Sequence, residues 1–100
     1  MADPRLTVVK MLMKMESSEA YSNLLLDHAF NEAELSDRDK AFAAALFYGV
    51  LERRLTLDHV IRTNSKIAFE KLDKAAVQIL RTGLYQLLYM PSVPESAAVN

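Results

Sequence analysis

The sequence predicts a single all-α domain, and three observations support this prediction. The chain has 100 residues, which is the length of one small domain. Hydrophobic residues make up 51% and charged residues 25%, with only two glycines and three prolines, a composition typical of helix-rich globular proteins. Apolar residues recur at helical spacing along most of the chain, so we expect a helical bundle.

Two helices are expected in the first third of the chain. Pro4–Glu16 has a capping residue in Asp3 and a proline at its first position, where proline fits best. Its apolar face consists of Val8, Val9, Met11, Leu12, Met13 and Met15. With Ser17 or Ser18 as its cap, a second helix is expected to run to about Asn31.

The third helix is expected to be the central, buried one, over about residues 37–55. Ser36 can cap it, and Asp37 and Asp39 place negative charge at the positive end of the helix dipole. Residues 41–51 are all apolar or small, and a helix that is apolar on all sides is usually buried. Tyr48 lies inside this run and is therefore expected in the core.

Two further helices are expected in the second half of the chain. A short one covers Leu57 to about Arg62, and a long one is capped by Asp73 and runs to about Met90. The long helix has a polar face of Gln78, Arg81 and Thr82. Its apolar face, which we expect to be buried, consists of Ala76, Ile79, Leu80, Gly83, Leu84, Leu87 and Leu88. Another helix is expected to begin at Pro94, which suggests that the chain is part of a longer protein.

Both glycines lie inside these helical patterns. A glycine within a helix costs about 1 kcal/mol relative to alanine, so a packing reason is expected. We expect Gly49 and Gly83 to be buried, each against the backbone of another helix. With no glycine left for a loop, the chain has no glycine-rich phosphate or dinucleotide cradle.

The composition excludes several kinds of chemistry. There is no cysteine, so disulfides, thiolate metal sites and a cysteine nucleophile are absent. The two histidines lack metal-ligand spacing, and capping explains Asp37 and Asp39 without catalysis. We therefore expect no catalytic residue, metal or cofactor in this chain. No apolar run approaches the ~20 residues of a membrane span, so a soluble, cytoplasmic protein without a membrane partner is expected.

The basic residues fall into two groups. Arg5 and Arg38 align with buried helix faces, so structural ion pairs are expected, with RNA contact as the alternative. The others are expected at the surface, where they contact RNA phosphates or form solvated faces: Lys10, Lys14, Arg53, Arg54 and Arg81. Tyr85 and Tyr89 can stack on bases or pack within the domain.

Three blocks of the sequence resemble a known family. Residues 37–42 (DRDKAF) and 48–58 (YGVLERRLTLD) form the first, residues 79–88 (ILRTGLYQLL) the second and residues 94–100 (PESAAVN) the third. In this order they resemble NusB-like domains. They are most similar to the N-terminal domain of Sun/RsmB-type 16S ribosomal RNA cytosine-C5 methyltransferases.

The resemblance implies a NusB-like all-α bundle over residues 1–100 that binds RNA. In the methyltransferases this domain precedes a catalytic domain that uses S-adenosylmethionine and a cysteine nucleophile, neither of which has a site here. The expected function is to help position ribosomal RNA for such a catalytic domain in the same parent chain. A free-standing NusB-type antitermination factor is the first alternative. The net charge of −1 keeps a second one open, a protein-interaction module without RNA affinity.

Overall fold

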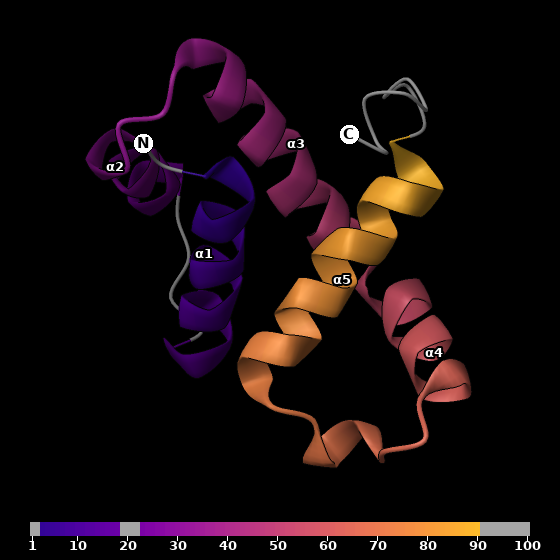
Figure 1. Ribbon diagram of the computed structural model, residues 1–100. Helices are drawn as coiled ribbons and strands as arrows, with labels where there is room; N and C mark the ends of the chain where they lie inside the picture. The colour runs from indigo at the N-terminus through magenta and orange to yellow at the C-terminus, as the bar shows by residue number, and fades with distance from the viewer. Residues whose placement is uncertain (1–2, 19–22, 91–100) are drawn as a thin grey trace.

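The structure, a computed structural model, describes residues 3–18 and 23–90. Within these ranges it contains five α-helices, one short 3-10 helix and no strand, which confirms the all-α prediction (Figure 1). The elements are α1 (Pro4–Ser18), α2 (Asn23–Glu32), α3 (Asp37–Glu52), α4 (Arg54–Asn64), the 3-10 helix η1 (Phe69–Lys71) and α5 (Lys74–Tyr89). None of the described helices is long and apolar enough to cross a membrane.

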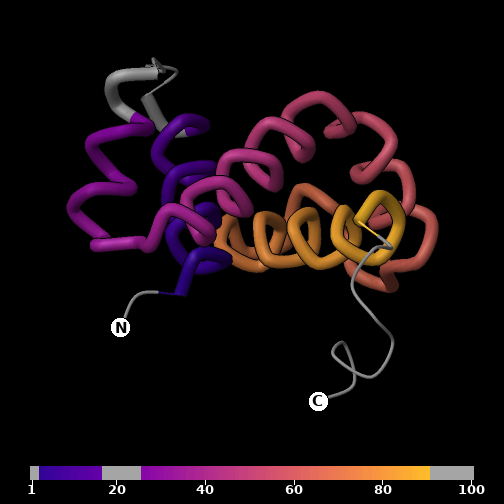
Figure 2. Tube along the Cα trace, turned by 90° about the horizontal axis from the view of Figure 1, so that it is seen from above, coloured from indigo at the N-terminus to yellow at the C-terminus, as the bar shows by residue number. Residues whose placement is uncertain are grey.

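Helices α1, α3 and α5 pack against one another and form the centre of the arrangement, so α3 shares the central place expected for it. In addition, α2 packs against α1, and α4 packs against α3 and α5. Seen from above, α3 and α5 lie side by side with α1 across one end of both (Figure 2). Helices α1, α2, α3 and α4 contribute buried side chains to one core, whose fully buried members include Val8, Leu46, Phe47 and Leu57.

One side of α3, however, faces solvent. Ala41 and Ala45 are exposed, and Tyr48 is 43% exposed, so the prediction that Tyr48 lies in the core is wrong. Its side chain lines an open groove between α2 and α3. The apolar run over residues 41–51 does not require burial on every side, because alanines and a tyrosine can lie at a surface at little cost.

Local capping signals predicted three helix starts correctly. At the first, the Asp3 carboxylate accepts a hydrogen bond from Arg5 N at 3.0 Å, and α1 begins at Pro4. The Ser36 hydroxyl accepts a hydrogen bond from Asp39 N at 3.1 Å, and the Asp73 carboxylate accepts from Ala75 N and Ala76 N. Two other boundaries differ from the prediction. Helix α1 continues through Ser18, so its last serines do not cap α2, and α4 begins at Arg54, three residues before the predicted start. The helix expected after Pro94 lies outside the described residues.

The two glycines behave differently. Gly49 is buried in α3, and a side chain there would overlap the ring of Tyr85 on α5. The close contact is therefore confirmed, although the neighbour is a side chain rather than a backbone. Gly83 is half-buried, and no atom lies within 4 Å of where its Cβ would be. The prediction of a close helix crossing at Gly83 is wrong.

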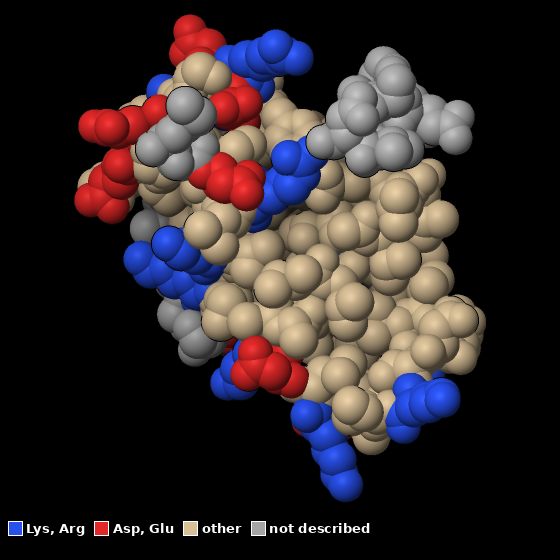
Figure 3. Space-filling view, in the orientation of Figure 1, with Lys and Arg blue, Asp and Glu red and all other residues tan. Residues whose placement is uncertain are grey.

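Helix α5 buries the face that was predicted to be exposed. Its buried residues are Val77, Gln78, Arg81 and Thr82, three of them from the face expected to be polar and exposed. Of the five large apolar side chains on the expected inner face, only Leu84 packs against the core. The other four point outwards: Ile79 (57% exposed), Leu80 (42%), Leu87 (77%) and Leu88 (51%). Figure 3 shows a wide surface without charged side chains over much of this helix.

Candidate nucleic-acid interface

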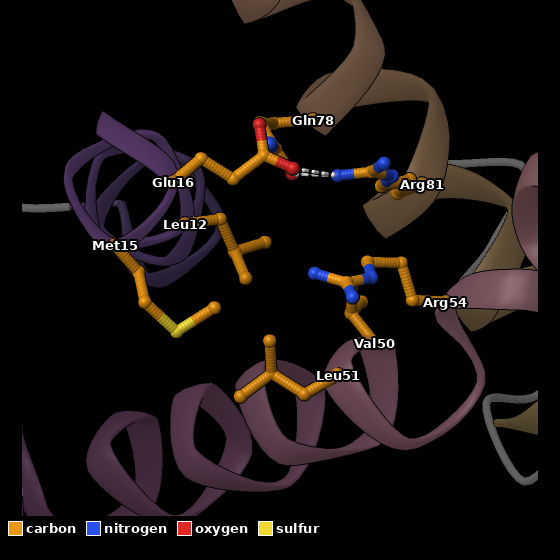
Figure 4. Close-up of a pocket in the computed structure, with 8 residues that line it drawn as sticks. All are labelled: Leu12, Met15, Glu16, Val50, Leu51, Arg54, Gln78 and Arg81. Carbon is orange, nitrogen blue, oxygen red and sulfur yellow. Dashed lines mark hydrogen bonds and ion pairs between the residues drawn. The ribbon is translucent and has the colours of Figure 1, made fainter. Parts of the chain in front are cut away.

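Arg81 was expected at the surface, and the structure places it in the interior. It is 5% exposed. Its Nε and Nη2 donate to the two carboxylate oxygens of Asp58 at 2.7 and 2.8 Å, and Nη1 donates to Glu16 at 2.6 Å (Figure 4). Nη1 also donates to Gln78 Oε1 at 3.3 Å. Because these groups occupy the guanidinium, Arg81 is part of the domain's internal framework.

This network explains the orientation of α5. Burial lowers the pKa of Arg81, but the hydrogen bonds and negative charges of Asp58 and Glu16 outweigh burial, so the pKa is raised and the charge is kept. The three residues come from α5, α4 and α1, and their contacts tie these helices together. A buried guanidinium with two carboxylate partners is a directional link, and removing one partner would leave an uncompensated charge in the interior.

The space beside Arg81 is not a ligand pocket. Apolar side chains of α1 and α3 line it together with Glu16, Arg54, Gln78 and Arg81, and Figure 4 shows Arg54 reaching toward it from below Arg81, on the same side of the view. The gap is too narrow for a water molecule. Gln78 Nε2 is buried there and has no hydrogen-bond partner among the described residues. Within the same ranges, no group of three or more histidine, aspartate or glutamate side chains could hold a metal ion.

Four of the five expected RNA contacts are exposed. Lys10 and Lys14 lie on α1, and Arg53 and Arg54 lie at the junction of α3 and α4. Among the described residues, Lys10, Arg53 and Arg54 form no salt bridge. The helix junction therefore carries two consecutive exposed arginines without a salt bridge among the described residues, Arg53 beside Tyr89 of α5 and Arg54 beside the gap that Glu16 also lines.

Within residues 3–18 and 23–90, the expected ion pairs of Arg5 and Arg38 are absent. Arg5 is exposed, its Nε donates to Gln86 Oε1 at 2.7 Å, and its guanidinium lies 5.0 Å from the ring centre of Phe42. Arg38 is exposed and has no salt bridge within the described residues. Both predictions fail for one reason: each arginine stays in water, where it requires no carboxylate. Asp37 is exposed in the first turn of α3, where it suits the helix dipole.

The tyrosines on α5 stack on one another. The rings of Tyr85 and Tyr89 are half-buried, 5.2 Å apart between centres and inclined by 29°. The guanidinium of Arg53 lies 4.8 Å from the ring centre of Tyr89. The sequence gives no signal for this contact, since Arg53 and Tyr89 come from different helices and meet only through tertiary packing.

The comparison with known families agrees with the three sequence blocks. Residues 2–100 match the model of the NusB family. This match covers almost the whole chain, so the chain belongs to the NusB family, and the resemblance is confirmed.

Two kinds of relative are similar to the chain. The "Probable ribosomal RNA small subunit methyltransferase B" of Bacillus subtilis is 35% identical over 89% of this chain and 20% of its own length. The protein of the same name from Synechocystis sp. is 36% identical with the same coverage. The "Transcription antitermination protein NusB" of Ruminiclostridium cellulolyticum is 29% identical over 96% of this chain and 67% of its own length. The chain thus spans about a fifth of these methyltransferases. No solved structure matches it.

Proposed function

We propose that this chain is an RNA-binding domain and that the α3–α4 junction is part of its RNA-binding surface. The observation that carries the proposal is the exposed pair Arg53 and Arg54, which form no salt bridge among the described residues of a NusB-family domain. Unneutralised cations supply the phosphate attraction on which most RNA affinity depends. Lys10 and Lys14 on α1 are the second candidate surface.

In its parent protein, the domain helps to position ribosomal RNA for a methyltransferase domain in the same chain. Two relatives named as ribosomal RNA methyltransferases, 35% and 36% identical, support this role. S-adenosylmethionine then belongs to that catalytic domain, and the 100 residues described here are not an enzyme by themselves. The parent protein acts on ribosomal RNA in the cytoplasm.

A free-standing antitermination factor is the second candidate. It is supported by relatives named as NusB antitermination proteins, whose length this chain spans to 67% and 71% in two cases. Reading the parent gene beyond Asn100 decides between the two. A methyltransferase domain is expected to follow, whereas a stop codon within a few dozen codons would overturn the methyltransferase role.

RNA binding itself is tested by salt-titrated affinity for 16S ribosomal RNA fragments. The Arg53→Glu/Arg54→Glu variant is expected to bind more weakly and to reduce the salt slope by about 0.7 for each lost single-strand contact. Lys66→Glu/Lys71→Glu changes two exposed lysines by the same charge and serves as the matched control. The corresponding double reversal of Lys10 and Lys14 measures the contribution of α1. Absence of measurable binding at low salt would overturn the proposal and favour a protein-interaction module.

A further inference from the structure

We infer that the guanidinium of Arg53, held over the ring of Tyr89, is a stacking platform for an unpaired RNA base. The inference rests on the proposed RNA-binding function and deepens it by naming the part of the RNA that this surface recognises. A phosphate group requires only a positive charge near it. A base requires a flat, preorganised surface with one side open.

The backbone of Arg53 is held from both sides because this residue joins α3 to α4. Its N–H donates to Gly49 O at 3.0 Å, and its carbonyl oxygen accepts from Leu57 N at 2.9 Å. The start of the side chain is therefore fixed by two helices, although the side chain itself is exposed.

The side chain is supported by a column of rings. Tyr85 fills the space that Gly49 leaves free on α3, Tyr89 stacks on Tyr85 at 5.2 Å, and Arg53 lies 4.8 Å from the ring centre of Tyr89. The column thus leads from a buried glycine to an exposed guanidinium. Tyr85 and Arg53 both lie against Tyr89, and Arg53 is the one exposed side chain of the three, so its guanidinium is the group that a base can reach.

Arg53 differs from the other arginines that lie near an aromatic ring, because its side chain has no polar partner among the described residues. Arg62 and Arg81 also lie near an aromatic ring, that of Phe69, but both are salt-bridged to carboxylates. Arg5 lies near Phe42 and donates to Gln86. Arg53 has neither a salt bridge nor a side-chain hydrogen bond among the described residues. Its donors are therefore available to a phosphate or base edge while its face is stacked.

The test separates stacking from charge by replacing arginine with lysine. Binding of single-stranded and duplex RNA of equal length is compared for the wild-type chain, Arg53→Lys and Arg62→Lys, with 2-aminopurine in the single strand as a stacking probe. Arg53→Lys keeps the charge but loses the planar group. Its affinity for the single strand is expected to fall about tenfold, with the salt slope unchanged and the 2-aminopurine quenching lost. Arg62→Lys, the control from a salt-bridged site, is expected to bind like the wild type.

A second pair of variants tests whether the ring of Tyr89 is needed to hold the guanidinium of Arg53 in place. Tyr89→Phe keeps the ring and is expected to bind normally, whereas Tyr89→Leu removes it and is expected to weaken single-strand binding as Arg53→Lys does. Thermal unfolding of each variant shows whether the fold is intact. If the wild type binds RNA and Arg53→Lys binds equally well, the stacking inference is overturned while the proposed function stands. If the wild type binds no RNA, both are overturned.

Discussion

Along α5, Gln78, Arg81 and Thr82 turn into the molecule, whereas Leu87 and Leu88 turn out of it. In most surface helices the apolar stripe faces the core and the polar face meets water. Here the inner face is held by a guanidinium with two carboxylate partners, and among the described residues the outer face has no comparable contact. The comparison shows that helical periodicity identifies the polar and the apolar face of a helix but does not decide which of them is buried.

The inner face is expected to be highly sensitive to substitution. Replacing Arg81 by methionine leaves Asp58 without its partner in a largely buried position, and the free energy of unfolding is expected to fall by about 3 kcal/mol. Urea denaturation measures it. Arg62→Met, which removes an exposed arginine beside the same phenylalanine ring, is the control and should change stability much less. A loss below about 1 kcal/mol for Arg81→Met would contradict the importance of the network.

Gly49 on α3 and Gly83 on α5 allow one substitution to be compared in a crowded and in an open environment. Gly49→Ala places a Cβ in the ring of Tyr85, so a loss of about 1–3 kcal/mol in the free energy of unfolding is expected from overpacking. Gly83→Ala adds a Cβ in open space and removes the entropic cost of a helical glycine, so a gain of up to about 1 kcal/mol is expected. Thermal denaturation compares the two variants, and equal effects would show that the two environments do not differ.

Polar substitution on the outer face is expected to have little effect. Leu87 is 77% exposed, and Leu87→Gln should change the free energy of unfolding by no more than about 0.5 kcal/mol. Leu46→Ala in the fully buried core is the contrasting variant and should cost about 2–5 kcal/mol. Both are measured by denaturant unfolding. A large loss for Leu87→Gln would mean that the outer face contributes to the stability of the domain.

The smallest effect is expected at the exposed ion pair of Arg62 and Glu70. The hydrogen bond from Arg62, at 2.7 Å, lowers the pKa of Glu70 below its ordinary value of 4.5. Because the folded state favours the ionised carboxylate, its contribution is present above pH 4.5 and is lost as the pH falls through the lowered pKa. The melting temperatures of the wild type and Glu70→Gln should therefore differ slightly at pH 7 and converge in acid. A difference that grows on acidification would contradict this sign.

Features that depend on near neighbours were predictable. The capping by Ser36 and Asp73 follows from residues two or three positions away, and the helices they begin lie where expected. The buried contact at Gly49 was also anticipated, because a helical glycine inside an apolar segment needs a packing reason. The same argument failed at Gly83, where no atom lies within 4 Å of the position that a Cβ would take.

The candidate site was only partly predictable. Sequence patterns identified Arg53 and Arg54 as exposed cations, but Arg81 was grouped with them because its helical position looked polar. Its partners lie 23 and 65 residues away in the sequence, on α4 and α1. No local pattern reports such pairings, and the same holds for Arg53 and Tyr89.

The sequence by itself determined the all-α class, the helix starts with side-chain caps and, through three blocks of residues, membership of the NusB family. Local hydrogen bonds and helical periodicity, which act over a few residues, are sufficient for the first two. Only the tertiary structure decided which face of α5 is buried and which arginines remain available at the surface. These depend on contacts between distant helices, such as the pairing of Arg81 with Asp58 and Glu16, which lie 23 and 65 residues away in the sequence.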